Sequence, residues 1–167
     1  MKEIRGTQVL DCSAERFWAL YLDDTFTRRL FIEEMGWEDP VIKVVKDDEH
    51  EVVRTMEAQP KLNLPAAAAR MISKTLGYHE DGRFDKKAKR WTMKHVTNIF
   101  GEKVDLSGEF TANDLGDGRC ERHAVFRIDV KIFGVAGLLE RAIEPNVHRL
   151  WEQNTSFTNR WVKAHPE

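Results

Sequence analysis

Residues 135–163 read VAGLLERAIEPNVHRLWEQNTSFTNRWVK. Apolar or small side chains recur here at steps of three and four residues, the spacing that places them on one face of an α-helix. This face comprises Leu139, Ile143, Val147, Leu150, Asn154, Phe157 and Trp161. The pattern predicts one long amphipathic helix. Pro145 removes a hydrogen bond within it, so we expect a kink there or a short separate helix before it.

The sequence ahead of this helix is mostly extended. Segments rich in β-branched and alternating residues, separated by turn residues, predict seven strands. These strands are expected at residues 3–11, 40–46, 50–58, 78–84, 89–98, 103–113 and 119–133. Because short links join consecutive strands, we expect antiparallel pairing.

Three shorter helices are expected between the strands. Ser13 is a suitable N-cap for the first, and Asp24 for a second that Gly36 ends. Pro65 suits the first position of a third, inserted helix near residues 65–76. This insertion carries apolar residues between 60 and 77, and it is either a movable lid over a cavity or a static covering helix.

The number of strands constrains the architecture. Seven strands spaced ~4.8 Å apart make a flat sheet roughly 33 Å wide, which a helix about 10 Å across cannot cover. The predicted fold class is therefore α+β: a curved antiparallel sheet of about seven strands wrapped around the long C-terminal helix, with two short helices after the first strand. The interior of such a fold is either filled by side chains or hollow.

Two stretches resemble the START-like (SRPBCC) superfamily. Residues 9–18, VLDCSAERFW, resemble its first strand followed by a polar helix cap. Residues 132–140, IFGVAGLLE, resemble a bacterial branch of unknown function and VASt-type sterol-binding domains, in which a strand leads through small residues into the final helix. The resemblance spans nearly the whole chain and implies a single START-like domain, residues 1–167, with the helix-grip fold. It also implies binding of lipids, sterols, polyketides or other hydrophobic molecules, while a minority of members act as cyclases or hydrolases.

Composition and motifs exclude several function classes. The 26 Lys and Arg residues against 28 Asp and Glu argue against a nucleic-acid partner. No apolar run approaches the ~18 residues of a transmembrane segment. Without an HExxH, CxxC, GxGxxG or P-loop motif, we expect no metal and no cofactor. Cys12 and Cys120 lie in no Cys-His motif, so we expect reduced, packed thiols in a cytoplasmic protein.

Two basic features could meet acidic groups. The run Lys86–Arg90 is either a solvated hairpin turn or a surface for transient membrane contact. Arg54 shares one strand face with Val52 and Met56, so this cation needs an anionic partner or water. Either an internal carboxylate, Glu80 or Glu109, or the headgroup of an anionic ligand would serve.

Strand and helix periodicity together predict the residues that face the interior. The candidate ligand-binding residues are Arg54, Met56, Trp91, Met93, His95, Leu106, Phe110, Phe126, Ile128, Leu139, Ile143, Val147 and Leu150. His95 is the histidine on this face, and a packed or ligand-contacting role is favoured over a catalytic base.

Three functions fit these observations. The first is binding or carriage of a hydrophobic small molecule, lipid, sterol-like or polyketide-like, between sheet and C-terminal helix, without catalysis. The second is a polyketide cyclase or hydrolase-like enzyme that uses His95 with a nearby carboxylate. The third is a ligand-free interaction module with a filled core. The sequence predicts no oligomeric state.

Overall fold

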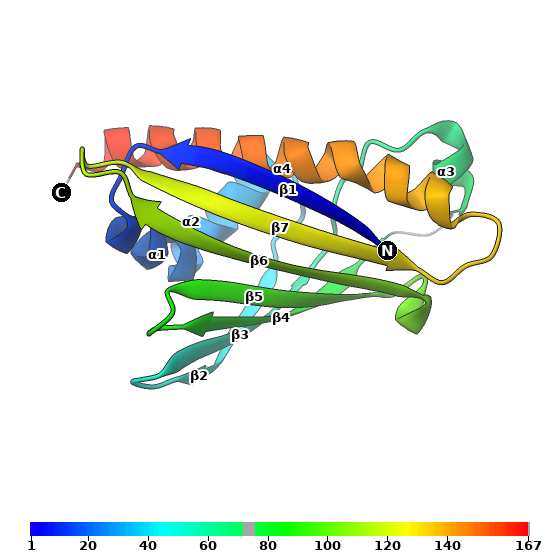
Figure 1. Ribbon diagram of the computed structural model, residues 1–167, viewed down its shortest axis with the longest axis horizontal. Helices are drawn as coiled ribbons and strands as arrows, with labels where there is room; N and C mark the ends of the chain where they lie inside the picture. Colours follow the sequence, from blue (N-terminus) through cyan, green and yellow to red (C-terminus); the bar gives the residue numbers. More distant parts are fainter. Residues whose placement is uncertain (72–75, 167) are drawn as a thin grey trace.

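The computed structural model describes residues 1–71 and 76–166 (Figure 1). The seven strands are β1 (Lys2–Leu10), β2 (Val41–Asp47), β3 (Glu51–Ala58), β4 (Tyr78–Asp85), β5 (Arg90–Thr97), β6 (Val104–Asp114) and β7 (Cys120–Val130). The α-helices are α1 (Ala14–Leu22), α2 (Asp24–Arg29), α3 (Ala66–Met71) and α4 (Ala136–Ala164). A π-helical turn, η1 (Leu30–Glu34), extends α2, and a 3₁₀ turn, η2 (Gly101–Lys103), precedes β6.

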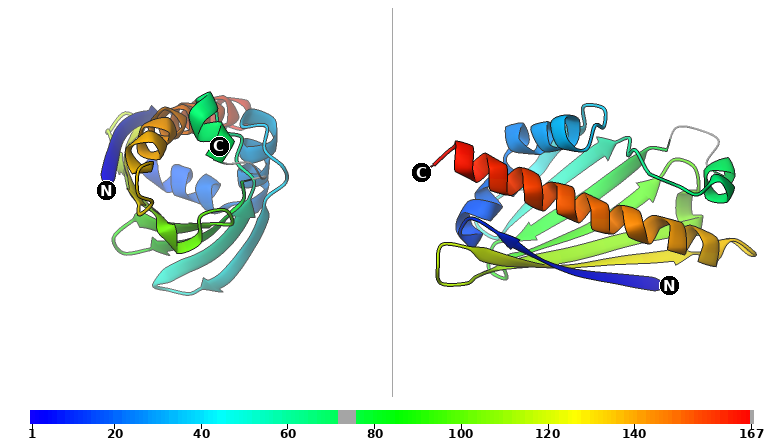
Figure 2. Two further views of the ribbon diagram at one scale, coloured as in Figure 1. Left: turned by 90° about the vertical axis from the view of Figure 1, so that its right-hand side faces the viewer. Right: turned by 90° about the horizontal axis from the view of Figure 1, so that it is seen from above.

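All seven strands form one antiparallel sheet in the order β1-β7-β6-β5-β4-β3-β2. The sheet curves, and α4 runs along its concave side next to β1 and β7 (Figures 1 and 2). This arrangement confirms the predicted α+β class and the helix-grip fold. The last strand ends at Val130, earlier than predicted, because residues 131–135 form the connection to α4.

Helix α4 is continuous through Pro145, so the alternative of a short separate helix before it is wrong. Gly6 in β1 allows the helix to approach the sheet closely. A Cβ atom at this position would lie 2.5 Å from the ring of Trp151, which is closer than real Cβ contacts. The indole of Trp151 therefore occupies the space that a side chain on β1 would need.

The shorter helices lie at opposite ends of the sheet (Figure 1). At one end Ser13 caps α1 as predicted, accepting a hydrogen bond from the backbone N–H of Arg16 at 3.2 Å. The cap of α2 is Asp23, whose carboxylate accepts from Phe26, and not the predicted Asp24. At the other end lies α3, whose described part is shorter than predicted; residues 72–75 of the prediction lie outside the described residues.

The buried side chains gather at these two ends. Around α1, Phe17 and Trp18 pack with Phe84 and Phe110 from the sheet. Under the first turns of α4, Leu139 packs against a second group, Ile4, Val104, Ala142, Val147, Ile128 and Val130. Trp151 of α4 packs against both groups, and members of both, including Phe110 and Leu139, line a cavity beneath α4.

Candidate functional site

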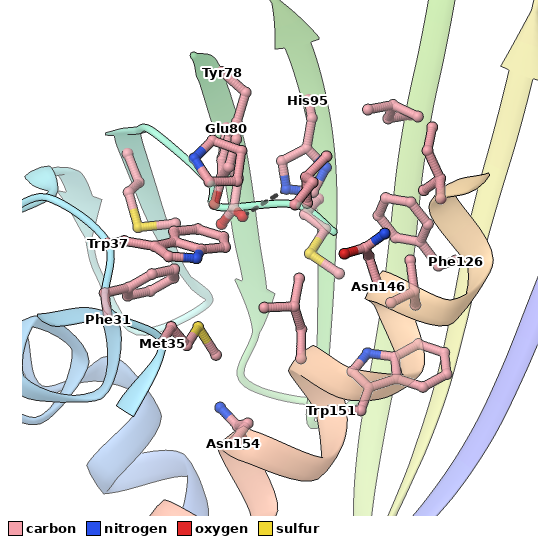
Figure 3. Close-up of a pocket in the computed structure, with 18 of the residues that line it drawn as sticks. Phe31, Met35, Trp37, Tyr78, Glu80, His95, Phe126, Asn146, Trp151 and Asn154 are labelled. Carbon is pink, nitrogen blue, oxygen red and sulfur yellow. Dashed lines mark hydrogen bonds and ion pairs between the residues drawn. The ribbon is translucent and has the colours of Figure 1, made fainter. Parts of the chain in front are cut away.

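A cavity of about 230 Å³ lies between the curved sheet and α4. It is larger than the engineered ~150 Å³ cavity that accommodates benzene in another protein, so a ring-sized ligand has room. Most of its lining side chains are apolar, and they come from β3 to β7, from α1, α2 and η1, and from α4. Figure 3 shows Phe31, Trp37, Phe126 and Trp151 around this common space.

Most of the sequence-predicted ligand-binding residues line this cavity. They are Arg54, Met56, Met93, His95, Leu106, Phe110, Phe126, Leu139, Ile143, Val147 and Leu150. Ligand contact by these residues stays a prediction. The other two, Trp91 and Ile128, also face the interior but are fully buried and do not line the cavity.

Cross-strand packing explains the position of Trp91. A Cβ atom on Gly82, in the neighbouring strand β4, would lie 1.9 Å from the indole of Trp91. The missing side chain at position 82 leaves a space that the indole fills, so Trp91 packs onto the sheet and away from the cavity. Ile128 is covered in a comparable way by the apolar group under the first turns of α4.

The sequence analysis missed several lining residues on helices and loops. Tyr21, Trp37, Asn146, Trp151 and Asn154 all line the cavity. The spacing of Trp151 from Val147, four residues along one helix face, was a usable signal. Trp37 lies in an irregular segment after η1, and no periodicity points to it.

A buried polar pair lies within this apolar lining. Nε2 of His95 is 2.8 Å from Oε2 of Glu80, and the two residues are 9% and 4% exposed. Neither Nδ1 of His95 nor Oε1 of Glu80 has a hydrogen-bond partner among the described residues. Burial raises the pKa of Glu80, but the hydrogen bond and charge of His95 and the charge of Arg54 outweigh it, so the pKa lies below its ordinary value. The carboxylate is therefore ionised, with one oxygen and one ring nitrogen left for a ligand.

Arg54 lies beside this pair and is 2% exposed. One guanidinium nitrogen, Nη1, donates to the backbone carbonyl of Tyr21 at 2.9 Å, while Nε has no partner among the described residues. The guanidinium lies 5.0 Å from the ring centroid of Tyr21 and 4.8 Å from that of Trp91, which are cation–π distances. The alternative that Arg54 pairs with Glu109 is wrong, because Glu109 pairs with Arg90 and Arg127 instead.

Arg122, on β7, is a second buried cation on the cavity wall. Its Nε donates to Gln8 Oε1 at 2.9 Å and its Nη1 to Asn154 Oδ1 at 2.5 Å. Burial lowers the pKa of Arg122 to about 10, so the side chain remains protonated at neutral pH. Alternation could have identified Arg122 from the sequence, since it shares a strand face with Ala124 and Phe126.

The structure also bears on metal binding, the two cysteines, membrane-spanning helices and the basic run. Within residues 1–71 and 76–166, no group of three or more His, Cys, Asp and Glu side chains could hold a metal ion. Cys12 and Cys120 are buried, and the neighbouring Cys12 thiol together with burial raises the pKa of Cys120. The described helices include none that is both long and apolar enough to cross a membrane. The basic run Lys86–Arg90 forms the β4–β5 turn, as one alternative predicted, and lies at the end of the sheet opposite α3 (Figure 1).

Comparison with known families and curated proteins gives a family but no activity. A family described as "Protein of unknown function (DUF2505)" matches residues 5–162. No curated protein matches the chain.

Solved structures show the same fold at low sequence identity. The Zhui aromatase/cyclase from Streptomyces sp. R1128 superposes with a TM-score of 0.68 at 9% identity, covering 99% of this chain and 96% of that one. Norcoclaurine synthase from Thalictrum flavum, in complex with dopamine and hydroxybenzaldehyde, gives 0.67 at 13% identity, covering 99% and 88%. A START superfamily protein from Mycobacterium smegmatis gives 0.61 at 7% identity, covering 95% and 98%. The predicted resemblance to START-like proteins is confirmed at the level of the fold.

Proposed function

The chain belongs to the DUF2505 family of proteins of unknown function, and we propose that it binds and carries a hydrophobic small molecule in the cavity between the sheet and α4. The candidate ligands are lipid, sterol-like or polyketide-like compounds. The predicted lining residues on β3, β5, β6, β7 and α4 would contact the apolar body of the ligand. Apolar burial would supply most of the affinity, at about 0.8 kcal/mol per buried CH₂ group.

One observation carries this proposal: an apolar cavity remains open inside a core that is otherwise tightly packed. Side chains at both ends of the molecule, such as Leu10, Trp91 and Ile128, are completely buried, whereas the middle is hollow. Protein interiors normally leave few voids larger than a water molecule. A ligand-free module with a filled core, the third hypothesis, does not need this space.

The similar structures support a small-molecule function. One is an aromatase/cyclase, and another holds dopamine and hydroxybenzaldehyde. Dopamine and hydroxybenzaldehyde each contain an aromatic ring. The cavity of this chain is lined by aromatic side chains including Phe31, Trp37 and Phe126.

Native mass spectrometry of the protein purified from its own host tests this proposal directly. We expect an added mass that disappears on organic extraction, and an extracted compound that rebinds to the purified protein with one-to-one stoichiometry. Protein without added mass that also fails to bind any hydrophobic probe would contradict the proposal.

A second candidate function, acid–base catalysis, is favoured by the His95–Glu80 pair. A carboxylate that orients one imidazole nitrogen leaves the other to exchange a proton with a bound molecule, and Nδ1 of His95 has no described protein partner. His95→Ala separates the two functions. Turnover of a cyclisable polyketide mimic that is lost while binding persists would favour the enzyme, whereas the absence of turnover in the unsubstituted protein would favour the carrier.

Exchange of a lipid ligand would require contact with a membrane, and we include such transient contact in the proposal. It would occur at the α3 end, through the β7–α4 connection, where Phe133 is fully exposed to solvent. An exposed aromatic side chain suits insertion at a membrane interface. The proposed compartment is the cytoplasm, supported by the two buried thiols.

A further inference from the structure

The charges on the cavity wall do not balance. Arg54 and Arg122 both line the cavity, at 2% and 3% exposure. Among the described lining residues, Glu80 is the one acidic side chain. The two guanidinium cations and one carboxylate leave an excess of positive charge inside an apolar enclosure.

The polar partners of the two arginines are neutral. Arg54 donates to a backbone carbonyl, and Arg122 donates to Gln8, Asn154 and Thr155 and to the carbonyl of Trp151. Within the described part of the chain, no carboxylate lies within ion-pair distance of either guanidinium. Glu80 interacts electrostatically with Arg54, but the hydrogen bond of the Glu80 carboxylate is made with His95.

Aromatic contacts place both cations at the α1 end of the cavity. The guanidinium of Arg54 lies 5.0 Å from the ring centroid of Tyr21, on α1, and that of Arg122 lies 6.0 Å from the ring of Phe110, whose centroid is 4.9 Å from that of Tyr21. The opposite end, below α3, is lined by apolar side chains, among them Leu64, Phe100 and Leu139. The cavity therefore carries its two cations near α1, whereas its lining near α3 is largely apolar and includes the uncharged Asn146.

A buried cation without a counter-charge is energetically costly, and a bound anion would remove much of that cost. Arginine suits this role because its planar guanidinium matches the geometry of a carboxylate. Resting on the proposed function, we infer that the ligand of this cavity carries a carboxylate, bound at the α1 end between Arg54 and Arg122, with its apolar body directed toward α3.

A matched pair of probes tests this inference. Naphthalene-2-carboxylate and naphthalene-2-methanol have similar size and shape, but only the first is an anion at neutral pH. Isothermal titration calorimetry should show that the unsubstituted protein binds the carboxylate about tenfold more tightly than the alcohol, as expected for a charge-assisted hydrogen bond.

Two variants with opposite expected effects on carboxylate affinity extend the test. Arg54→Met should remove the preference, weakening the carboxylate while leaving the alcohol within about threefold. Glu80→Gln removes the competing negative charge, so it should strengthen carboxylate binding. If Arg54→Met fails to fold, this variant tests the inference by itself. Arg83→Met, on the exposed side of β4, is the matched control and should leave both affinities unchanged.

The outcomes separate this inference from the proposed function. Equal affinity for both probes, or a preference for the carboxylate that survives Arg54→Met, would overturn the inference that the ligand carries a carboxylate. The proposal of hydrophobic ligand binding would remain. Weaker carboxylate binding by Glu80→Gln would also count against the inference. If neither probe binds up to its solubility limit, the inference fails, whereas the proposed function fails only if the purified protein also carries no extractable ligand.

Discussion

Oε2 of Glu80 lies 2.8 Å from Nε2 of His95, on adjacent strands, where positions 80 and 95 pair directly in the register of β4 and β5. The sheet itself therefore sets the geometry of the pair, without help from a loop. Because both side chains are buried in an apolar cavity, the ionised carboxylate depends on its neighbours for solvation.

This dependence predicts how stability changes with pH. The pKa of Glu80 is lower in the folded protein than in the unfolded chain, so its stabilising contribution is present above the unfolded pKa, about 4.3. That contribution is lost as the pH falls below this value toward the folded pKa. Urea unfolding between about pH 7 and pH 3.5 should show a smaller loss of unfolding free energy for Glu80→Gln than for the unsubstituted protein. The exposed residue Glu152 provides a control, and equal pH dependence in Glu80→Gln and Glu152→Gln would contradict the prediction.

Gly82→Ala should destabilise the protein by about 1–3 kcal/mol, because the added methyl group overlaps the indole of Trp91. The neighbouring stack on Arg54 would move with the indole. Gly137→Ala in α4 is the matched control: its new Cβ would lie 3.8 Å from the nearest side-chain atom, and alanine is the better helix former. Chemical unfolding of both variants measures the difference. Equal stability of the two would show that Trp91 does not need the space at position 82.

Filling the cavity should abolish ligand binding at little cost in stability. Leu106→Trp places a larger side chain on the cavity wall, so we expect naphthalene probes to lose measurable affinity while the unfolding free energy changes by less than about 1 kcal/mol. Ile128→Val, in the packed core beside it, should show the reverse: a loss of about 0.5–1.5 kcal/mol with unchanged affinity. Probe binding that survives in Leu106→Trp would mean that the probe binds elsewhere.

Phe133→Asp should reduce co-sedimentation with phosphatidylcholine–phosphatidylserine vesicles several-fold, since burial of a phenylalanine side chain contributes about 1.5–3 kcal/mol. Val45→Asp, at an exposed position on β2, adds the same charge away from α3 and should have no effect. Equal loss in both variants would point to net charge, and no loss in either would remove membrane contact at this connection from the proposal.

The sequence predicted which face of β3, β5, β6 and β7 points inward, because alternation has a fixed period of two residues. It could not separate a side chain that lines the cavity from one that fills the core, since that difference depends on cross-strand register. Trp91 is the example: its position follows from Gly82, and only the folded sheet brings these residues together.

The cavity-lining residues on helices and loops were harder to predict than those on the strands. Tyr21 and Trp37 reach the cavity because α1, α2 and η1 pack across one end of the sheet, and the periodicity of these segments does not encode that placement. Glu80 was considered as a partner for Arg54, whereas its hydrogen bond goes to His95. Side chains at positions 80 and 95 both face inward, but alternation alone does not reveal which inward-facing residues are paired.

The close packing of Trp91 against Arg54 also gives the protein an intrinsic fluorescent reporter. The indole is fully buried, and the guanidinium lies 4.8 Å from its ring centroid. Indole emission responds to nearby charge, so a molecule that neutralises this guanidinium would change the fluorescence spectrum without any attached dye. Fluorescence titration with unlabelled, optically transparent compounds therefore provides a screen for ligands of the cavity.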